Sequence, residues 1–116
     1  MGYDVHITRA SSWLDSEELP ITLEEWLSYI KNDAEMRRDD QATAFVDGKP
    51  VLTYENPGLT VWTAWSENEP DGNMAWFDYR DGRIIVKNPD EEILDKMKQI
   101  AVALDAKVIG DEDEEY

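Results

Sequence analysis

The fold of this chain is decided by residues 59–87, "LTVWTAWSENEPDGNMAWFDYRDGRIIVK". Three runs rich in β-branched and aromatic residues occur in it, at residues 59–66, 74–80 and 83–87. Such residues favour β-strands. Asp81 and Gly82 supply the backbone angles of a tight hairpin turn between the last two runs. A longer loop, residues 67–73, joins the first two. Because both connections are short, we expect three consecutive antiparallel strands.

Further strands are expected on both sides of this stretch, at residues 3–8, 42–46, 51–55 and 106–110. In the first of them, Tyr3, Val5 and Ile7 alternate with polar residues, as a half-buried strand requires. Asp47 and Gly48 give a second hairpin signal between the runs on either side of them. The short connections favour an antiparallel meander.

Two amphipathic helices complete the expected fold. Thr22 can cap the first helix and Glu25 can complete a capping box with it. We expect this helix to end near Lys31 and to be followed by a polar turn. The second helix is expected within residues 88–107, with Asn88 as its N-cap. The sequence therefore predicts an α+β fold in the order β-α-β-β-β-β-β-α-β. This is an antiparallel meander sheet of about six or seven strands with two helices packed on one face.

Length and composition predict a single folded domain. The chain has 116 residues, 41% of them hydrophobic, so residues 1–110 can bury a sizeable core. Residues 111–116, "DEDEEY", carry five carboxylates and are expected to form a solvated acidic C-terminal tail. There is no cysteine, no stretch of about 20 apolar residues and no signal-peptide pattern, which predicts a soluble cytoplasmic protein.

Net charge limits the choice of partner. The 27 acidic and 11 basic side chains give a formal net charge of −16 at pH 7. A field of this sign repels nucleic acid and anionic membranes, because binding to phosphates depends on Lys and Arg replacing bound cations. It attracts basic proteins and speeds their encounter. We therefore expect a basic protein as the partner, and neither nucleic acid nor a membrane, although the same charge would also serve solubility alone.

The runs at residues 59–66 and 74–80, with the loop that joins them, are expected to form an aromatic hairpin with large apolar side chains on both faces. Val61 and Trp62 point to opposite faces, because side chains alternate along a strand. Trp76 and Phe77 do the same. Either residues 11–20, "SSWLDSEELP", and the polar turn after the first helix cover the second face, or tryptophans on it are partly exposed within an acidic rim, as in protein-binding hot spots. The second interpretation gives the candidate partner-binding residues, which are Trp62, Trp65, Glu67, Glu69, Asp71 and Trp76, with Trp13, Asp15, Glu17 and Glu18 beside them.

Catalysis is not expected. The single histidine is His6, and the chain has no nucleophile motif, no phosphate-binding glycine loop and no zinc-protease motif. Glu67, Glu69 and Asp71 begin a pattern similar to a calcium-binding EF-hand loop, but Pro70 interrupts it and strands flank it. We therefore expect no catalytic residue, no metal and no cofactor.

Four segments carry a resemblance to other proteins. They are "YDVHITRA", "ITLEEWLSYI", "AWFDYRDGRIIVKNPDEEI" and "AKVIGDE". Together they resemble a set of small acidic bacterial proteins, most of them uncharacterised, over nearly the whole chain. In size, acidity and lack of catalytic motifs the chain is also similar in type to immunity proteins, which neutralise antibacterial toxins. The resemblance implies a non-catalytic inhibitor of a basic toxin, because an acidic inhibitor is steered to a basic, phosphate-binding surface.

Two other functions stay open. A DNA mimic would inhibit a nucleic-acid-binding protein, and it needs carboxylates spaced like phosphates along one elongated face. A small-ligand domain or enzyme would need a pocket between the sheet and the helices. An acidic surface with exposed tryptophan would favour protein binding, whereas a deep polar pocket near His6 would favour the small-ligand alternative.

Overall fold

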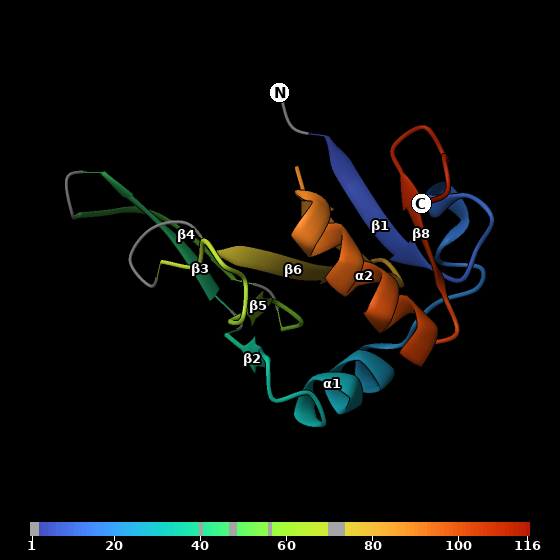
Figure 1. Cartoon of the computed structure of the whole chain (residues 1–116), viewed down its shortest axis with the longest axis horizontal. Helices are drawn as coiled ribbons and strands as arrows, with labels where there is room; N and C mark the ends of the chain where they lie inside the picture. Colours follow the sequence, from blue (N-terminus) through green and yellow to red (C-terminus); the bar gives the residue numbers. More distant parts are fainter. Residues whose placement is uncertain (1–2, 40, 47–48, 56, 70–73) are drawn as a thin grey trace.

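The computed structural model describes residues 3–39, 41–46, 49–55, 57–69 and 74–116, with the backbone alone for 41–46 and 49–55. It confirms the α+β class, because two α-helices accompany a six-stranded antiparallel sheet in the described residues (Figure 1). The elements are β1 (Asp4–Thr8), the 3-10 helix η1 (Trp13–Asp15), α1 (Leu23–Lys31), β2 (Met36–Arg38), β3 (Gln41–Val46), β4 (Lys49–Glu55), β5 (Thr60–Trp62), β6 (Ala75–Arg80), β7 (Arg83–Lys87), α2 (Glu91–Ala103) and β8 (Lys107–Gly110).

The six-stranded sheet has the strand order β2-β5-β6-β7-β1-β8, and every neighbouring pair is antiparallel. The first strand of the chain therefore lies inside the sheet. His6 of β1 pairs with Ile85 of β7 on one side and with Ile109 of β8 on the other. β3 and β4 form a separate two-stranded ladder, which extends from the side of the molecule that carries β2 and β5 (Figure 1).

Two strands differ from the expected pattern. Met36 begins β2, a short strand in a place where the sequence suggests a polar turn, and it pairs with Trp62 of β5. β5 ends at Trp62, earlier than expected. The following residues turn toward α2, where the indole Nε1–H of Trp65 donates a hydrogen bond to the Asp90 carboxylate at 3.0 Å. This contact with the helix replaces continued pairing with β6.

Both helices cover one face of the sheet, as expected, and α2 crosses it obliquely (Figure 1). The buried side chains on this face follow the alternation of the strands and the apolar stripe of each helix. They include Val5, Ile7, Phe77, Ile84 and Val86 from the sheet and Trp26, Ile30, Ile93, Met97 and Ile100 from the helices. Burial of each large apolar side chain contributes about 1.5–3 kcal/mol, so this core is the main source of stability.

Capping explains where each helix begins. Thr22 accepts a hydrogen bond from the N–H of Glu25 at 3.1 Å, and the Glu25 carboxylate accepts one from the N–H of Thr22 at 3.1 Å, which confirms the capping box. α2 is capped by Asp90, not by Asn88 as expected. Asn88 has a φ of 47°, and its side-chain oxygen accepts a hydrogen bond from the N–H of Tyr3 at 2.9 Å. Its side chain therefore fastens the start of β1 instead of the helix.

The acidic C-terminal segment, residues 111–116, is mostly exposed, and its backbone folds back along β8. The N–H of Tyr116 donates to the carbonyl of Val108 at 2.9 Å, and Glu115 forms a β-bridge with Ile109. These contacts continue the edge of β8. Main-chain hydrogen bonds thus hold the backbone of this highly charged segment, and the carboxylates of Asp111 and Asp113 add side-chain contacts with the rest of the protein.

Candidate functional site

We call the face of the sheet opposite the helices the outer face. It carries most of the candidate functional residues. A row of side chains crosses it from β8 to β6, because the register pairs Ile109 with His6, His6 with Ile85, and Ile85 with Asp78. The two ends of this row differ. η1 and the C-terminal segment cover the end at β1 and β8, and a pocket lies at the end near β6.

η1 is held on the outer face by Trp13. Its indole ring stacks on the imidazole of His6, with ring centroids 4.6 Å apart and planes within 5°. Its Nε1–H donates to the carbonyl of Asp111 at 3.0 Å, and the Arg83 guanidinium lies 5.0 Å from the ring centroid. Trp13 is half-buried as a result. The expectation that residues 11–20 could cover the second face therefore holds at this end of the sheet.

The imidazole of His6 is only 2% exposed and has a partner at each nitrogen. Nδ1 faces Nε–H of Arg83 at 3.3 Å, so it accepts, and Nε2 therefore carries the proton that it donates to the Asp111 carboxylate at 2.8 Å. Burial lowers the pKa of His6, and Asp111 opposes this effect only in part. Within the described residues, neither nitrogen is hydrogen-bonded to a hydroxyl group. The imidazole joins β1, β7 and the C-terminal segment.

An acidic corner forms where residues 11–19 meet residues 111–116. Asp113 joins the two segments, because its carboxylate accepts hydrogen bonds from the Ser12 hydroxyl at 3.1 Å and the N–H of Trp13 at 3.3 Å. The corner contains eight carboxylates and no Lys or Arg. Two large apolar side chains rise from it, Leu14 at 72% and Leu19 at 58% exposure. The predicted partner-binding residues Asp15, Glu17 and Glu18 are all exposed here, beside Trp13.

The predicted residues of the aromatic hairpin are divided between the two faces. Trp62 is 7% exposed and donates from Nε1 to Glu35 at 3.1 Å, so it belongs to the core and presents little surface to a partner. Trp65 packs against the same core beside α2. Trp76 is half-buried on the outer face, where it pairs with Val61. Glu67 and Glu69 are exposed in the loop, and Asp71 lies outside the described residues.

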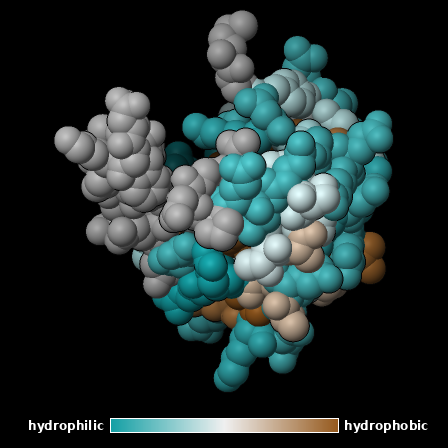
Figure 2. All heavy atoms as spheres, turned by 60° about the vertical axis from the view of Figure 1, so that its left-hand side comes forward, coloured by the Kyte–Doolittle hydropathy of each residue, from teal (hydrophilic) through white to brown (hydrophobic). Residues whose placement is uncertain are grey.

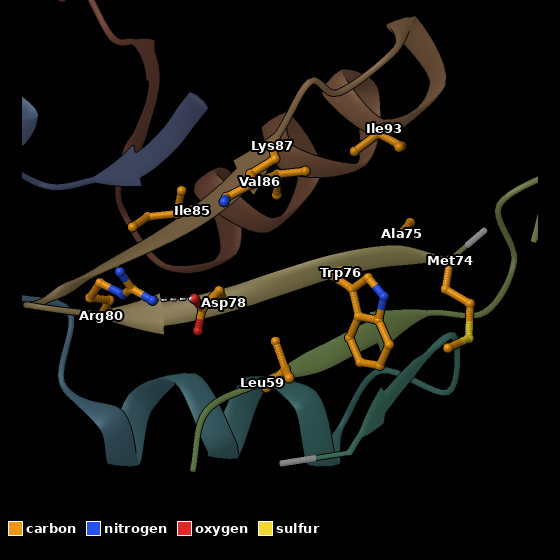
Figure 3. Close-up of a pocket in the computed structure, with 10 residues that line it drawn as sticks. All are labelled: Leu59, Met74, Ala75, Trp76, Asp78, Arg80, Ile85, Val86, Lys87 and Ile93. Carbon is orange, nitrogen blue, oxygen red and sulfur yellow. Dashed lines mark hydrogen bonds and ion pairs between the residues drawn. The ribbon is translucent and has the colours of Figure 1, made fainter. Parts of the chain in front are cut away.

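A pocket of about 350 Å³ lies where β6 and β7 separate, lined by outer-face side chains and by core residues such as Val86 and Ile93. These two strands pair only from Asp78 to Arg80. Before Asp78, β6 pairs with β5, and after Ile85, β7 pairs with β1. Figure 3 shows the two strands together at Arg80 and apart at the opposite end. The apolar lining includes Leu59, Met74, Trp76, Ile85, Val86 and Ile93.

A buried lysine was not foreseen from the sequence. Lys96 of α2 is 3% exposed, and its ammonium binds the carboxylates of Asp33 at 2.8 Å and Glu35 at 3.1 Å. It lies 5.9 Å from the ring centroid of Trp62. Burial pushes the pKa of Asp33 upward, but Lys96 and Tyr29 outweigh this effect, and the pKa is lowered overall. The cluster joins α2 to the segment after α1.

The rest of the visible surface is mainly polar. On the face shown in Figure 2, the described residues are largely hydrophilic, and apolar residues appear as separate spots. In the part of the chain that the structure describes, no three His, Asp or Glu side chains are placed to hold a metal ion. No helix among those residues is long and apolar enough to cross a membrane.

In comparisons with known proteins, no family model, no curated protein and no solved structure matches this chain.

Proposed function

We propose that this chain is a non-catalytic, acidic protein-binding domain that engages a basic partner through the acidic corner, in the manner of an immunity protein that neutralises a toxin. One observation carries the proposal. Leu14 and Leu19, 72% and 58% exposed, lie in residues 11–19, which together with residues 111–116 carry eight carboxylates and no Lys or Arg. Exposed apolar side chains among carboxylates match the apolar anchors within a polar rim that protein interfaces use.

Pre-ordering of the corner supports a binding role. The acidic segments 11–19 and 111–116 are held together by hydrogen bonds to Asp113 and by the stack of Trp13 on His6. A surface already fixed in its bound shape loses less conformational entropy when a partner arrives. Apolar anchors within a charged rim also match the anatomy of protein interfaces.

Charge supports a basic partner. The whole chain carries −16, so a positively charged protein is attracted from a distance and reaches the corner faster than a neutral one. The DNA-mimic alternative is weaker, because it needs an extended track of charge. The carboxylates of the corner instead gather at one end of a body that measures 42 × 32 × 24 Å.

Capture of the partner from extracts of the native host tests this proposal. The immobilised chain is compared with a double variant, Leu14→Ser with Leu19→Ser, and with Val102→Ser as the matched control. Val102 is 83% exposed on α2, away from the corner, so all three proteins should fold equally well. Binding is measured at about 50 mM and about 500 mM salt, since the Debye length shortens from roughly 14 Å to 4 Å between them.

The expected result is a basic protein that is retained by the wild type and by Val102→Ser, lost by the double variant, and released by salt. Cross-linking should place its contacts on residues 11–19. A toxin gene directly upstream would agree with this result. An acidic partner that is insensitive to salt, or one that the double variant retains, would contradict the proposal.

A further inference from the structure

The pocket between β6 and β7 has the size and the lining of a small-ligand site, separate from the acidic corner. Its volume of about 350 Å³ lies at the lower end of the usual range for ligand sites, which is roughly 300–1,000 Å³. Trp76 and Met74 lie side by side at the β6 end (Figure 3), and Ile85 and Leu59 contribute further apolar walls. A group of this size is a single ring or a short branched chain.

The charged side chains of the lining differ in whether they have a partner of opposite charge. Asp78 and Arg80 pair with each other, with 3.1 Å between Oδ2 and the guanidinium nitrogen. Lys87 lies on β7 at the open end, is exposed, and its ammonium makes no ion pair or hydrogen bond with any other residue that the structure describes. Asp4 lies opposite Lys87 across the β1–β7 pair but does not line the pocket. The ammonium is therefore the cation available to a bound group.

We propose that this pocket binds a small apolar carboxylic acid, with its ring or alkyl group against Trp76 and its carboxylate at the ammonium of Lys87. Apolar contact would supply most of the affinity, since a planar ligand can stack on an indole and the walls remove it from water. The carboxylate would fix its orientation. This site needs no protein partner, so the inference does not rest on the proposed function.

The net charge of the chain and the charges near the pocket predict opposite preferences for the charge of the ligand. The chain as a whole carries −16 and would favour a cationic ligand. At about 0.15 M salt, however, charges more than roughly 8 Å away are largely screened, so the nearby groups should decide. Asp78 and Arg80 offset each other, and Asp4 weakens the attraction of Lys87 from the neighbouring strand without lining the pocket. A ligand series that differs in charge alone separates the two effects.

The test uses nuclear magnetic resonance titration of the ¹⁵N-labelled chain with 3-phenylpropionate, 3-phenylpropanamide and 3-phenylpropylamine. The indole N–H of Trp76 and the backbone amide of Ile85 report on the pocket. We expect shifts at both signals, with the carboxylate bound about 2- to 5-fold more tightly than the amide, as for a partly exposed ion pair. The amine should bind most weakly.

Two variants assign the roles. Lys87→Gln should remove the preference for the carboxylate over the amide, whereas Lys98→Gln, the same change at an exposed position on α2, should keep it. Trp76→Leu should weaken all three ligands about tenfold through loss of stacking and area. Equal affinity for carboxylate and amide, tightest binding of the amine, a preference that survives in Lys87→Gln, or no shifts up to about 10 mM ligand would each overturn the proposal.

Discussion

Replacement of Lys96 by alanine should destabilise the fold more than any other single change of a charged residue in α2. The Lys96 side chain is 2% exposed and its ammonium binds Asp33 and Glu35, so its removal leaves two carboxylates without their cation. Breaking a buried ion pair by removal of one partner costs about 3–5 kcal/mol. Glu35 is 53% exposed and can return to water, whereas Asp33 is 13% exposed and cannot. The expected loss of unfolding free energy is therefore about 2–3 kcal/mol.

Urea denaturation followed by circular dichroism measures this loss. With a slope of about 1–3 kcal/mol per molar urea, the midpoint should fall by about 0.7–3 M. Lys98→Ala is the matched control, because Lys98 is exposed on the same helix, and it should change the free energy by less than about 0.5 kcal/mol. The double variant Lys96→Met with Asp33→Asn should recover most of the loss, because it leaves no charge unpaired at that position.

The pH dependence gives a second check on the same residues. The pKa of Asp33 is lowered in the folded chain, so its ionised form contributes stability above the unfolded pKa of about 3.9, and this contribution is lost as the pH falls through the lowered value. The difference between the wild type and Lys96→Ala should therefore shrink near pH 3. If Lys96→Ala matched Lys98→Ala at neutral pH, the assignment of Lys96 as a paired, buried cation would be wrong.

Three further predictions concern the outer face and the start of α2. Trp13→Ala should lower the free energy of unfolding by about 2 kcal/mol, because the indole is half-buried, and hydrogen exchange of residues 108–116 should accelerate; unchanged exchange would show that η1 does not hold the C-terminal segment. Burial lowers the pKa of His6, so the unfolded chain binds this proton more readily and stability should fall as the pH drops below about 6.5; His6→Gln should lack this part of the urea-denaturation pH profile. Asn88→Ala should cost about 1–2 kcal/mol in the same assay, because Asn88 has a positive φ, and Asn88→Gly should cost less; equal losses would argue against backbone strain.

Much of the fold could be predicted because its signals are local. Strand alternation placed Val5 and Ile7 on the buried face, and the capping box at Thr22 marked the start of α1. The cap of α2 was assigned two residues early, because Asn88 and Asp90 are both good N-caps. Only the contact of Asn88 with Tyr3, far away in sequence, decides between them.

The candidate site could be predicted only in part. Period-two alternation separates Trp62 from Val61 correctly, but continued to residue 65 it would place Trp65 on the same face as Val61. Trp65 instead packs on the core, because the strand ends when the chain turns to reach α2. The acidic corner depends on contacts between segments about 100 residues apart, which no local pattern reveals. The sequence does contain a signal for the burial of Lys96, because this residue falls on the apolar stripe of α2 between Ile93 and Ile100. A lysine at such a position indicates a carboxylate partner across the helix.

The central place of β1 constrains how the protein can assemble. Residues 4–8 pair with residues 83–87 and 107–110, so this strand meets partners that are synthesised long after it. Contacts between distant segments are slow to form, since a long loop must close before they contribute. In the cell, the sheet could close around β1 only after residues 107–110 had left the ribosome. Until then, the apolar residues of β7 would remain open to chaperones or to aggregation.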